Sequence, residues 1–486
     1  MPLQKNQVLT LQVERLSSDG SGVAHSPEGE TVFIPGAAPG DEARVRIVKD
    51  CKRYAFGILD EVLTPSPDRI PVDCAVAGPC GGCSLRHLDY AAELRAKQEN
   101  VADAFARIGG LDVPVLPIVG SPEIDRYRNK VQFPVGTDKA GRPCIGFYAG
   151  RTHRIVPCPD CRLQPGVLNE IGNTLCAFFA EKGIHPYNEE TGKGLVRHIF
   201  LRRGAHSGQI MVCLVCTRAK LPSAEELCTR LKEEFPDIVT ILLNVNAKNT
   251  NVILGSETHT LYGQGYIEDT LCGVPVQLGP LSFYQVNTLA AEQLYGIAAE
   301  YAQLTPDDLL LDLYCGMGTI GLSMADHCRE LVGVEIVPEA IESAKANAAR
   351  MGAAVSAKSR FFCADAGQAA AQLASEGLQP DVVMLDPPRK GCDEATLSAV
   401  VRMAPRRVVY VSCNPATAAR DAAWLEQNGY HAEKVQPVDL FPRTKHVEAV
   451  LLLTKLNVER HIEVDVSMDE LDVTAAESKA TYHEIR

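Results

Sequence analysis

A short apolar run that leads into a glycine-rich loop is the strongest constraint on how this chain folds. Leu309–Leu313 predicts a buried strand, the loop 314–321 fits the pattern G-x-G-x-x-G, and a helical pattern comes next. Helical and strongly apolar segments continue to alternate from about residue 280 to residue 455. This alternation predicts a βαβ series, and therefore a Rossmann-like α/β domain with a mostly parallel sheet over residues 271–456.

An acid that suits a nucleotide follows the glycine loop. Gly316 and Gly318 allow a ligand to approach the backbone closely. Glu335 ends the next apolar strand, seventeen residues beyond Gly318, where its carboxylate can accept hydrogen bonds from both hydroxyls of a ribose. NAD and S-adenosylmethionine both contain that ribose. The loop and the acid therefore leave an NAD-linked oxidoreductase and a methyltransferase open.

A second loop separates these two alternatives. The apolar run VVMLD ends at Asp386, and the two prolines that follow make a rigid loop without backbone donors at the edge where α/β sheets bind ligands. Methyltransferases carry such a loop beside the methyl group, whereas NAD enzymes generally do not. Asp365, which ends the run RFFCAD, adds another acid to this edge. Together these residues favour S-adenosylmethionine as the cofactor.

Cys413 lies between a predicted strand and a predicted helix. The run VVYVS ends at Ser412, Asn414 is a favourable helix N-cap, and Pro415 is a favourable first helical residue. The dipole and the free N–H groups of a helix start favour the thiolate, which is the nucleophilic form of cysteine. A single cysteine is more often a small buried side chain. Its place at the ligand-binding edge nevertheless favours a nucleophile.

A thiolate beside a methyl donor suggests methylation of a pyrimidine at carbon 5. Carbon 5 of uracil attacks a sulfonium methyl only weakly, but addition of Cys413 to carbon 6 would make an enolate that attacks readily, and a base must then remove the proton from carbon 5. Glu448, at the start of the apolar run AVLLLT, is the first candidate, because burial would raise the pKa of its carboxyl. His446 is the rival candidate for this base.

Three segments of this half of the chain resemble one enzyme family. DPPRKG, VVYVSCNPAT and FPRTKHVE, in this order and spacing, closely resemble the RNA uracil-5-methyltransferases that act on transfer and ribosomal RNA. The resemblance implies Cys413 as nucleophile and Glu448 as base. It also implies cofactor contacts at several positions, and the loop and strand patterns add Gly316 and Asp365 to that set; the predicted cofactor residues are Gln285, Tyr314, Gly316, Glu335, Asp365 and Asp386.

The N-terminal segment predicts a small all-β domain over residues 1–63. Residues 8–62 alternate apolar and polar side chains in short runs between Gly, Pro and Asp, which is typical of a barrel of the OB type. The segment from GSGVAHSPEGE to ARVRIV resembles a TRAM domain, a small RNA-binding barrel found ahead of RNA-modifying enzymes. The charge of the segment gives no support for RNA binding, so an RNA contact here is implied by the resemblance alone.

A cysteine cluster follows a proline-rich linker. Cys74, Cys80 and Cys83 form one group, and Cys158 or Cys161 would supply a fourth ligand. Four thiolates can hold zinc or an iron–sulfur cluster, and the spacing leaves both open, although it does not fit a radical S-adenosylmethionine enzyme. The family resemblance implies a [4Fe–4S] cluster with Cys161 as the fourth ligand.

The region around the cluster predicts an α+β central domain over residues 64–270. Strands alternate with helices near 165–182 and 222–234, and a helix over 88–110 is expected to pack on the catalytic domain. The formal net charge of the chain is -13, but residues 126–162 hold eight Lys and Arg against two Asp. A local excess of this kind favours RNA as the partner. Cys213 and Cys216 lie three apart in an apolar strand and are expected to be core residues on opposite faces.

The remaining expectations concern the whole chain. Residues 457–486 are acidic and predicted to be a disordered tail, and no apolar run is long enough to span a membrane. We therefore expect a cytoplasmic monomer without an obligate protein partner. The combination of TRAM-like module and cluster favours 23S ribosomal RNA over transfer RNA as substrate. A non-catalytic RNA-binding protein is the alternative from another class, and the presence of both Cys413 and Glu448 argues against it.

Overall fold

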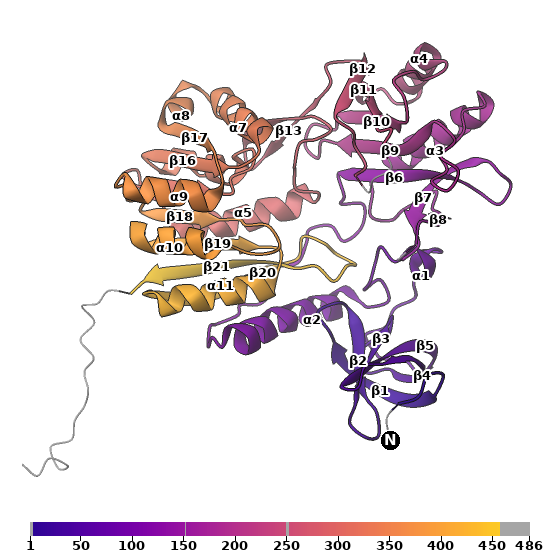
Figure 1. Ribbon diagram of the computed structural model, residues 1–486, viewed down its shortest axis with the longest axis horizontal. Coiled ribbons are helices and arrows are strands. Elements are labelled where there is room, and N and C mark those ends of the chain that lie inside the picture. Colours follow the sequence, from indigo (N-terminus) through magenta and orange to yellow (C-terminus); the bar gives the residue numbers. More distant parts are fainter. Residues whose placement is uncertain (1–2, 151, 249–251, 457–486) are drawn as a thin grey trace, which may run out of the picture.

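The N-terminal domain is a closed five-stranded barrel, as predicted. The computed structural model describes residues 3–150, 152–248 and 252–456 (Figure 1), so the predicted acidic tail lies outside the described residues. The strand order is β1-β2-β3-β5-β4, with β1 (Val8–Leu16), β2 (Ser21–His25), β3 (Thr31–Pro35), β4 (Glu42–Asp50) and β5 (Tyr54–Thr64). Alternate side chains such as Val13, Ile34 and Val45 point inward and fill the barrel.

One long helix lies between the barrel and the C-terminal domain, although the chain continues from it into the central domain. After the short helix α1 (Ala77–Cys80), helix α2 (Tyr90–Asp103) begins where Asp89 accepts a hydrogen bond from the backbone N–H of Ala92. It continues as a π-helix, η1 (Ala104–Gly109), and ends at Gly110, which adopts a left-handed φ of 65°. Figure 1 shows α2 lying between the barrel and the catalytic sheet. Helical residues therefore occupy most of the predicted range 88–110.

The central domain contains a mixed seven-stranded sheet. Its order is β12-β11-β10-β9-β6-β7-β8, with β6 (Lys130–Thr137), β7 (Pro143–Tyr148), β8 (Ile155–Pro157), β9 (Val196–Arg203), β10 (Ile210–Cys216), β11 (Ile238–Val245) and β12 (Glu257–Tyr262). Helices α3 (Gly166–Glu181) and α4 (Ala224–Glu234) occupy the two predicted positions. The hairpin β13 (Ile267–Leu271) and β14 (Val274–Leu278) leads on to the next domain. Cys213 and Cys216 are both buried and belong to different cores, as predicted.

The C-terminal domain has parallel strands in the centre of its sheet. The order is β17-β16-β15-β18-β19-β21-β20, with β15 (Leu309–Leu313), β16 (Glu330–Glu335), β17 (Ser359–Cys363), β18 (Val382–Leu385), β19 (Arg407–Ser412), β20 (Tyr430–Val438) and β21 (Glu448–Lys455). Strands β15 to β19 are parallel, whereas β20 and β21 pair antiparallel at one edge. The expectation of a mostly parallel sheet is therefore confirmed.

Helices cover both faces of this sheet and bury its apolar side chains. Leu310 and Val409 pack into a core with α5, while Leu311 and Tyr410 point to the opposite core, which α9, α10 and α11 help to form. The helices are α5 (Thr288–Ala302), α6 (Thr319–Ser323), the 3-10 turn η2 (Ala325–His327), α7 (Pro338–Met351), α8 (Ala353–Lys358), α9 (Ala366–Ser375), α10 (Glu394–Met403) and α11 (Pro415–Gln427). Among the residues described, no helix has the length and apolar character that a membrane crossing requires.

Candidate active site and cysteine pocket

Three loops at one edge of the C-terminal sheet carry the predicted nucleophile and acids. The glycine loop follows β15, Asp386 follows β18, and Cys413 follows β19. These strands are parallel, so their carboxyl ends meet at the same edge. Glu448 reaches this edge from the start of the antiparallel strand β21, where it is paired with Val438. The fold thus brings together residues that lie up to 134 positions apart between Tyr314 and Glu448.

The glycine loop orients the acid at the end of β16. Gly316 and Gly318 adopt left-handed φ angles of 54° and 79°, and Tyr314 does so at 64°. The backbone N–H of Gly316 donates to Glu335 Oε2 at 3.2 Å, and the other carboxylate oxygen accepts from the next two backbone N–H groups at 2.8 and 2.9 Å. Ile336, beside this carboxylate, is 61% exposed. A fixed acid next to an exposed apolar side chain suits a ribose with an attached flat base.

Asp312, the acid within LLLDL, is buried in this region but is not among the predicted cofactor residues. Its Oδ2 accepts from the backbone N–H of Gly321 at 3.0 Å, whereas its Oδ1 has no hydrogen-bond partner among the described residues. Burial raises the pKa of Asp312 to about 8. An unpartnered acceptor of this kind fits a ligand that brings a donor. Its signal in the sequence is weak, because an acid inside the apolar strand LLLDL is the only irregularity there.

The other predicted cofactor residues differ in how they are held. Asp386 is partly buried, and this burial raises the pKa of its carboxyl to about 7. The Gln285 side chain is hydrogen-bonded to the buried Tyr295, and the backbone carbonyl oxygen of Gln285 accepts from Asn129 Nδ2 at 2.7 Å. Asp365 instead caps α9, where its Oδ1 accepts two backbone N–H groups at 3.1 and 3.2 Å. A cofactor contact by Asp365 stays a prediction.

Cys413 is half-buried at the start of α11. Asn414 caps this helix as predicted, with its Oδ1 accepting from the backbone N–H of Ala416 at 3.2 Å. Burial raises the pKa of Cys413, and the carboxylates of Glu448 and Asp386 raise it further. The sequence predicted the opposite direction from the helix start alone. That prediction is wrong because the thiol is partly buried and because Glu448 and Asp386, brought in from other parts of the sheet, oppose the thiolate.

Glu448 has the buried environment that the sequence predicted. Its side chain is 5% exposed, and burial raises the pKa of its carboxyl well above the usual range, with a further contribution from Asp386. Arg389 acts in the opposite direction. The carboxyl lies close enough to Cys413 to affect the pKa of the thiol. This places a proton acceptor with a raised pKa beside the candidate nucleophile.

His446, the rival base, contacts an arginine. Arg389 Nη2 lies 2.8 Å from His446 Nδ1. Burial lowers the pKa of His446 to about 4, and the nearby cations, Arg389 first among them, lower it further. The imidazole is therefore neutral at physiological pH. Arg389 belongs to the DPPRKG segment, yet the sequence did not assign it a role.

A buried ionic network fixes the loop that carries His446. Lys97 on α2 donates to Glu93 Oε1 and to Asp439 Oδ1, both at 2.7 Å, and to the carbonyl oxygen of Phe441 at 3.1 Å. The backbone N–H of Arg443 donates to the same Glu93 oxygen at 2.7 Å. The three charged side chains are at most 1% exposed. Helix α2 thus holds the segment between β20 and β21 against the catalytic domain.

A groove leads from the barrel to Cys413. The cavity has a volume of about 520 Å³, and the barrel, the end of α2 with η1, and the loops of the catalytic edge all contribute to its walls. Phe33 lines it from the barrel and Ile108, which is 58% exposed, from η1. Lys445 and His446 line it beside Cys413. The groove is larger than a single base requires, so it can hold a longer part of a polymer.

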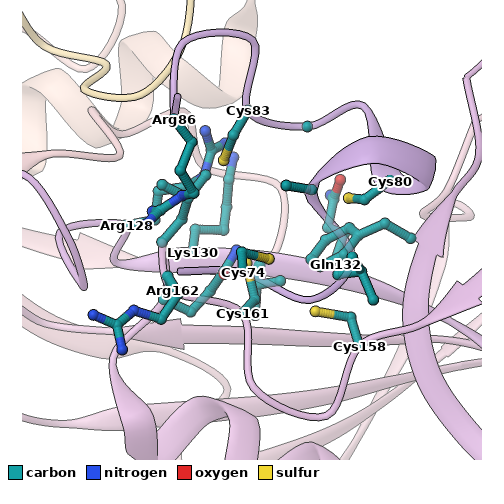
Figure 2. Close-up of a pocket in the computed structure, with 17 residues that line it drawn as sticks. Cys74, Cys80, Cys83, Arg86, Arg128, Lys130, Gln132, Cys158, Cys161 and Arg162 are labelled. Carbon is teal, nitrogen blue, oxygen red and sulfur yellow. The ribbon is translucent and has the colours of Figure 1, made fainter. Parts of the chain in front are cut away.

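Five cysteines line a second cavity, beside the central sheet. Figure 2 shows Cys74, Cys80 and Cys83 on one segment facing Cys158 and Cys161 on the other, around a cavity of about 260 Å³. Four cationic side chains line the same cavity: Arg86, Arg128, Lys130 and Arg162. Within the described parts of the chain, no three His, Cys, Asp or Glu side chains converge closely enough to hold one metal ion.

The thiols of this cavity differ in acidity. Burial raises the pKa of Cys83 to about 11. The pKa of Cys161 is lowered to about 7, chiefly by a hydrogen bond from Cys158 and also by the backbone N–H groups of Leu163 and Gln164. Cys158 and Cys161 are thus in direct contact, so the structure brings both candidates for the fourth ligand to the same wall. Their order of preference stays a prediction.

Comparisons with known proteins agree with this arrangement. Residues 275–456 match the family model described as tRNA (uracil-5-)-methyltransferase, and residues 2–59 match the TRAM domain. An uncharacterized RNA methyltransferase of Halalkalibacterium halodurans is 43% identical over 457 residues, which cover 94% of this chain and 99% of the relative. One from Bacillus cereus is 42% identical over 456 residues, covering 94% of this chain and 98% of the relative.

A solved structure with the same overall organisation also resembles this chain. It is the tRNA (uracil-54, C5)-methyltransferase of Pyrococcus abyssi in complex with S-adenosyl-L-homocysteine, with a TM-score of 0.73 and 27% identity, covering 92% of this chain and all of that one. The relatives match nearly the full length, and the edge of the sheet holds the acids that a nucleoside cofactor needs. The chain therefore belongs to the S-adenosylmethionine-dependent RNA uracil-5-methyltransferase family and carries an N-terminal TRAM domain.

Proposed function

We propose that this RNA methyltransferase methylates carbon 5 of a uridine in 23S ribosomal RNA through a covalent adduct with Cys413. The observation that carries the proposal is the pairing of a half-buried thiol with a buried carboxyl of raised pKa, at the ligand-binding edge of the sheet. A methyltransferase that used a nucleophilic substrate atom directly would need neither group. Uracil carbon 5 needs both, because it must be activated first and deprotonated afterwards.

The chain's own residues supply the steps on the base. The Cys413 thiolate forms a bond to carbon 6, and the electron pair of the 5,6 double bond moves toward the carbonyl oxygen at carbon 4. Carbon 5 of this enolate takes the methyl group. Glu448 then removes the proton from carbon 5, the double bond forms again, and the electron pair of the carbon–sulfur bond returns to Cys413. The thiolate is regenerated, and Glu448 passes its proton to solvent.

The cofactor residues fit S-adenosylmethionine, which supplies the methyl group when bound. Glu335, fixed by three backbone N–H groups, would bind the ribose hydroxyls, and the unpartnered Oδ1 of Asp312 would accept a hydrogen bond from the ligand. Tyr314 and Asp386 follow β15 and β18 at the same edge, and the family pattern assigns both residues and Gln285 to cofactor binding.

We also propose a [4Fe–4S] cluster held by Cys74, Cys80, Cys83 and Cys161. Zinc binds each sulfur at about 2.3 Å, so four ligands must converge on one point. The cysteines line a cavity of about 260 Å³, which has room for the larger multi-atom cluster that the family resemblance implies. The surrounding cations suit a group made anionic by thiolates. The reaction needs no electron transfer, so the cluster would hold the basic central domain in shape.

Substitution of the cluster ligands should separate the two candidate cysteines. After anaerobic purification, the wild-type protein should contain about four iron and four sulfide per chain. Cys161→Ala should lose most of this iron, whereas the matched control Cys158→Ala should keep it. The measurement is iron and sulfide content together with binding of S-adenosylmethionine, which both variants should retain. Zinc in place of iron, or iron loss in the Cys158 variant alone, would contradict this assignment.

The RNA substrate is expected to contact two surfaces, the groove beside Cys413 and the basic part of the central domain. The groove beside Cys413 joins the barrel to the catalytic edge, and the basic residues 126–162 belong to the central domain. A structured RNA can contact both surfaces, because phosphate contacts position the RNA while the base enters the active site. The combination of TRAM domain and cysteine cluster favours ribosomal RNA. The Pyrococcus abyssi relative acts on transfer RNA, so transfer RNA is the second candidate.

The choice of RNA can be tested with unmodified substrates. Ribosomal and transfer RNA from a strain that lacks this gene are incubated with the purified protein and S-adenosylmethionine, and nucleosides are analysed by mass spectrometry. We expect 5-methyluridine in 23S ribosomal RNA and none in transfer RNA. Methylation of transfer RNA alone would contradict ribosomal RNA as the substrate but would leave the proposed reaction unchanged. A methyl group on any other base would contradict the proposed reaction itself.

A further inference from the structure

Arg389 contacts two of the side chains at the candidate reaction centre. Its Nη2 lies 2.8 Å from His446 Nδ1, and its side chain is hydrogen-bonded to Cys413. All three line the groove that leads to the barrel. None of the roles considered so far uses this guanidinium, although it lies in the same loop as Asp386.

We propose that Arg389 is a further catalytic residue, whose guanidinium stabilises the Cys413 thiolate when it attacks the base and when it leaves. This inference rests on the proposed function of Cys413 as nucleophile. A guanidinium stays charged at any physiological pH and presents several N–H donors in a fixed plane. It can therefore donate to the thiolate and to a second acceptor at the same time, and it cannot itself take the thiol proton.

The backbone of Arg389 is fixed to the helix that carries Cys413. Its carbonyl oxygen accepts from Asn414 Nδ2 at 2.9 Å and from Thr417 Oγ1 at 3.3 Å. Both donors belong to the first turn of α11, directly after Cys413. These bonds link the loop after β18 to the start of α11. The backbone of Arg389 is therefore fixed close to Cys413, which helps to keep the guanidinium beside the sulfur.

His446 holds the other side of the guanidinium. Arginine has only donors, so His446 Nδ1 must be the acceptor in the 2.8 Å contact, and the proton of the neutral ring is on Nε2. The lowered pKa of His446, near 4, agrees with a neutral ring. Its ring also packs edge-on against Phe441 at 5.9 Å between centroids. His446 is therefore a positioning residue for Arg389, and its Nδ1 is not available as a base.

Arg389 opposes the groups that disfavour the thiolate. Burial, Glu448 and Asp386 all raise the pKa of Cys413, and Arg389 lowers it. The other cations of the groove stabilise the thiolate less. Arg15 and Arg107 both pair with Asp103, at 3.1 and 3.2 Å. Lys445 also lines the groove, but its side chain is exposed to solvent. Of the cations in the described groove, Arg389 is the one hydrogen-bonded to the sulfur. A cation in this position is what a reactive cysteine in a buried, acidic site requires.

The proton balance of the step is simple. The thiol of Cys413 loses its proton to solvent before the base binds, and Arg389 stabilises the anion that results. The sulfur then forms its bond to carbon 6. At the end of the cycle Glu448 holds the carbon 5 proton, and the sulfur leaves as the same anion beside the same guanidinium. Arg389 neither gains nor loses a proton at any point.

The test measures the acidity of Cys413 directly, without RNA or methyl donor. The rate of alkylation of Cys413 by iodoacetamide is followed against pH, with peptide mass spectrometry to resolve this thiol from the other sixteen cysteines. In Arg389→Met the midpoint of the profile should rise by about one pH unit or more, which means about tenfold slower alkylation at neutral pH. Arg389→Lys, the matched control, should keep most of the wild-type acidity.

A second variant controls for misfolding of Arg389→Met. His446→Phe keeps Arg389 but removes its acceptor, so the midpoint should rise by less than in Arg389→Met. Binding of S-adenosylmethionine, measured by calorimetry, checks that each variant is folded. Unchanged midpoints in folded Arg389→Met and His446→Phe would overturn the inference, even if Arg389→Met failed to methylate RNA. Failure of the proposed function would look different, since Cys413→Ala would then still methylate RNA whatever the alkylation profiles show.

Discussion

Replacement of Cys413 by alanine is expected to abolish methyl transfer and to leave binding of RNA and of S-adenosylmethionine close to wild type. Without the sulfur no adduct forms at carbon 6, so carbon 5 remains too weakly nucleophilic to take the methyl group. The side chain is half-buried, and its hydrogen bond to Arg389 is made at the surface of the groove, so the fold should tolerate its loss. Incorporation of labelled methyl into RNA measures the first effect, and gel shift and calorimetry measure the others.

The matched control for a missing thiol is Cys228→Ser. Cys228 is half-buried on α4 in the central domain, outside the catalytic edge, and this variant should methylate RNA at the wild-type rate. Turnover by Cys413→Ala within tenfold of wild type would refute the role of Cys413. Loss of both activity and cofactor binding would instead indicate that the substitution damages the fold, and Cys413→Ser would then be compared.

Replacement of Glu448 by glutamine should lower turnover by about 10²–10⁴-fold, the range typical of a removed general base. The amide keeps the shape of the side chain but cannot take the proton from carbon 5. The reaction should therefore stop after methyl transfer, with the RNA still attached to Cys413. Denaturing gels should show a protein–RNA adduct that carries labelled methyl, and an adduct without methyl, or none at all, would argue against Glu448 as the base.

The same substitution has a predictable effect on stability. Burial holds the pKa of Glu448 above its ordinary value of 4.5, so the folded protein binds this proton more tightly than the unfolded chain does. The cost of the buried carboxylate is absent below about pH 4.5 and grows as the pH rises through the raised pKa. Glu448→Gln should therefore have a higher thermal midpoint than wild type at neutral pH, and the difference should shrink as the pH falls. The wild-type rate should rise with pH over the same range, because only the ionised form is a base.

Local patterns in the sequence predicted the elements that carry the site. The apolar runs around Leu311 and Tyr410 are strands, Asn414 and Pro415 start a helix, and Glu448 begins a strand in a buried place. Each of these depends on residues that are neighbours in the chain, where strand and capping preferences act. The burial that raises the pKa of Glu448 could also be inferred, because the run that follows it is entirely apolar.

Contacts between distant segments could not be predicted in this way. Lys97 and Asp439 are 342 residues apart, and the sequence offers no sign that they meet in one buried network. Arg389 and His446 are 57 residues apart, so neither could be given the role that their contact implies. The direction of the shift in the pKa of Cys413 was wrong for the same reason. A helix start is a local feature, whereas the acids Glu448 and Asp386 come from other strands.

The covalent adduct between Cys413 and uracil carbon 6 is the central claim, and trapping it is the most direct measurement. RNA in which the target uridine is replaced by 5-fluorouridine lacks the proton that Glu448 would remove, so the methylated adduct should persist. After incubation with S-adenosylmethionine and proteolysis, mass spectrometry should find a methylated fluorouridine on the peptide that contains Cys413. An adduct on another residue, or efficient methylation of ordinary RNA with no adduct on the fluorinated one, would contradict the account.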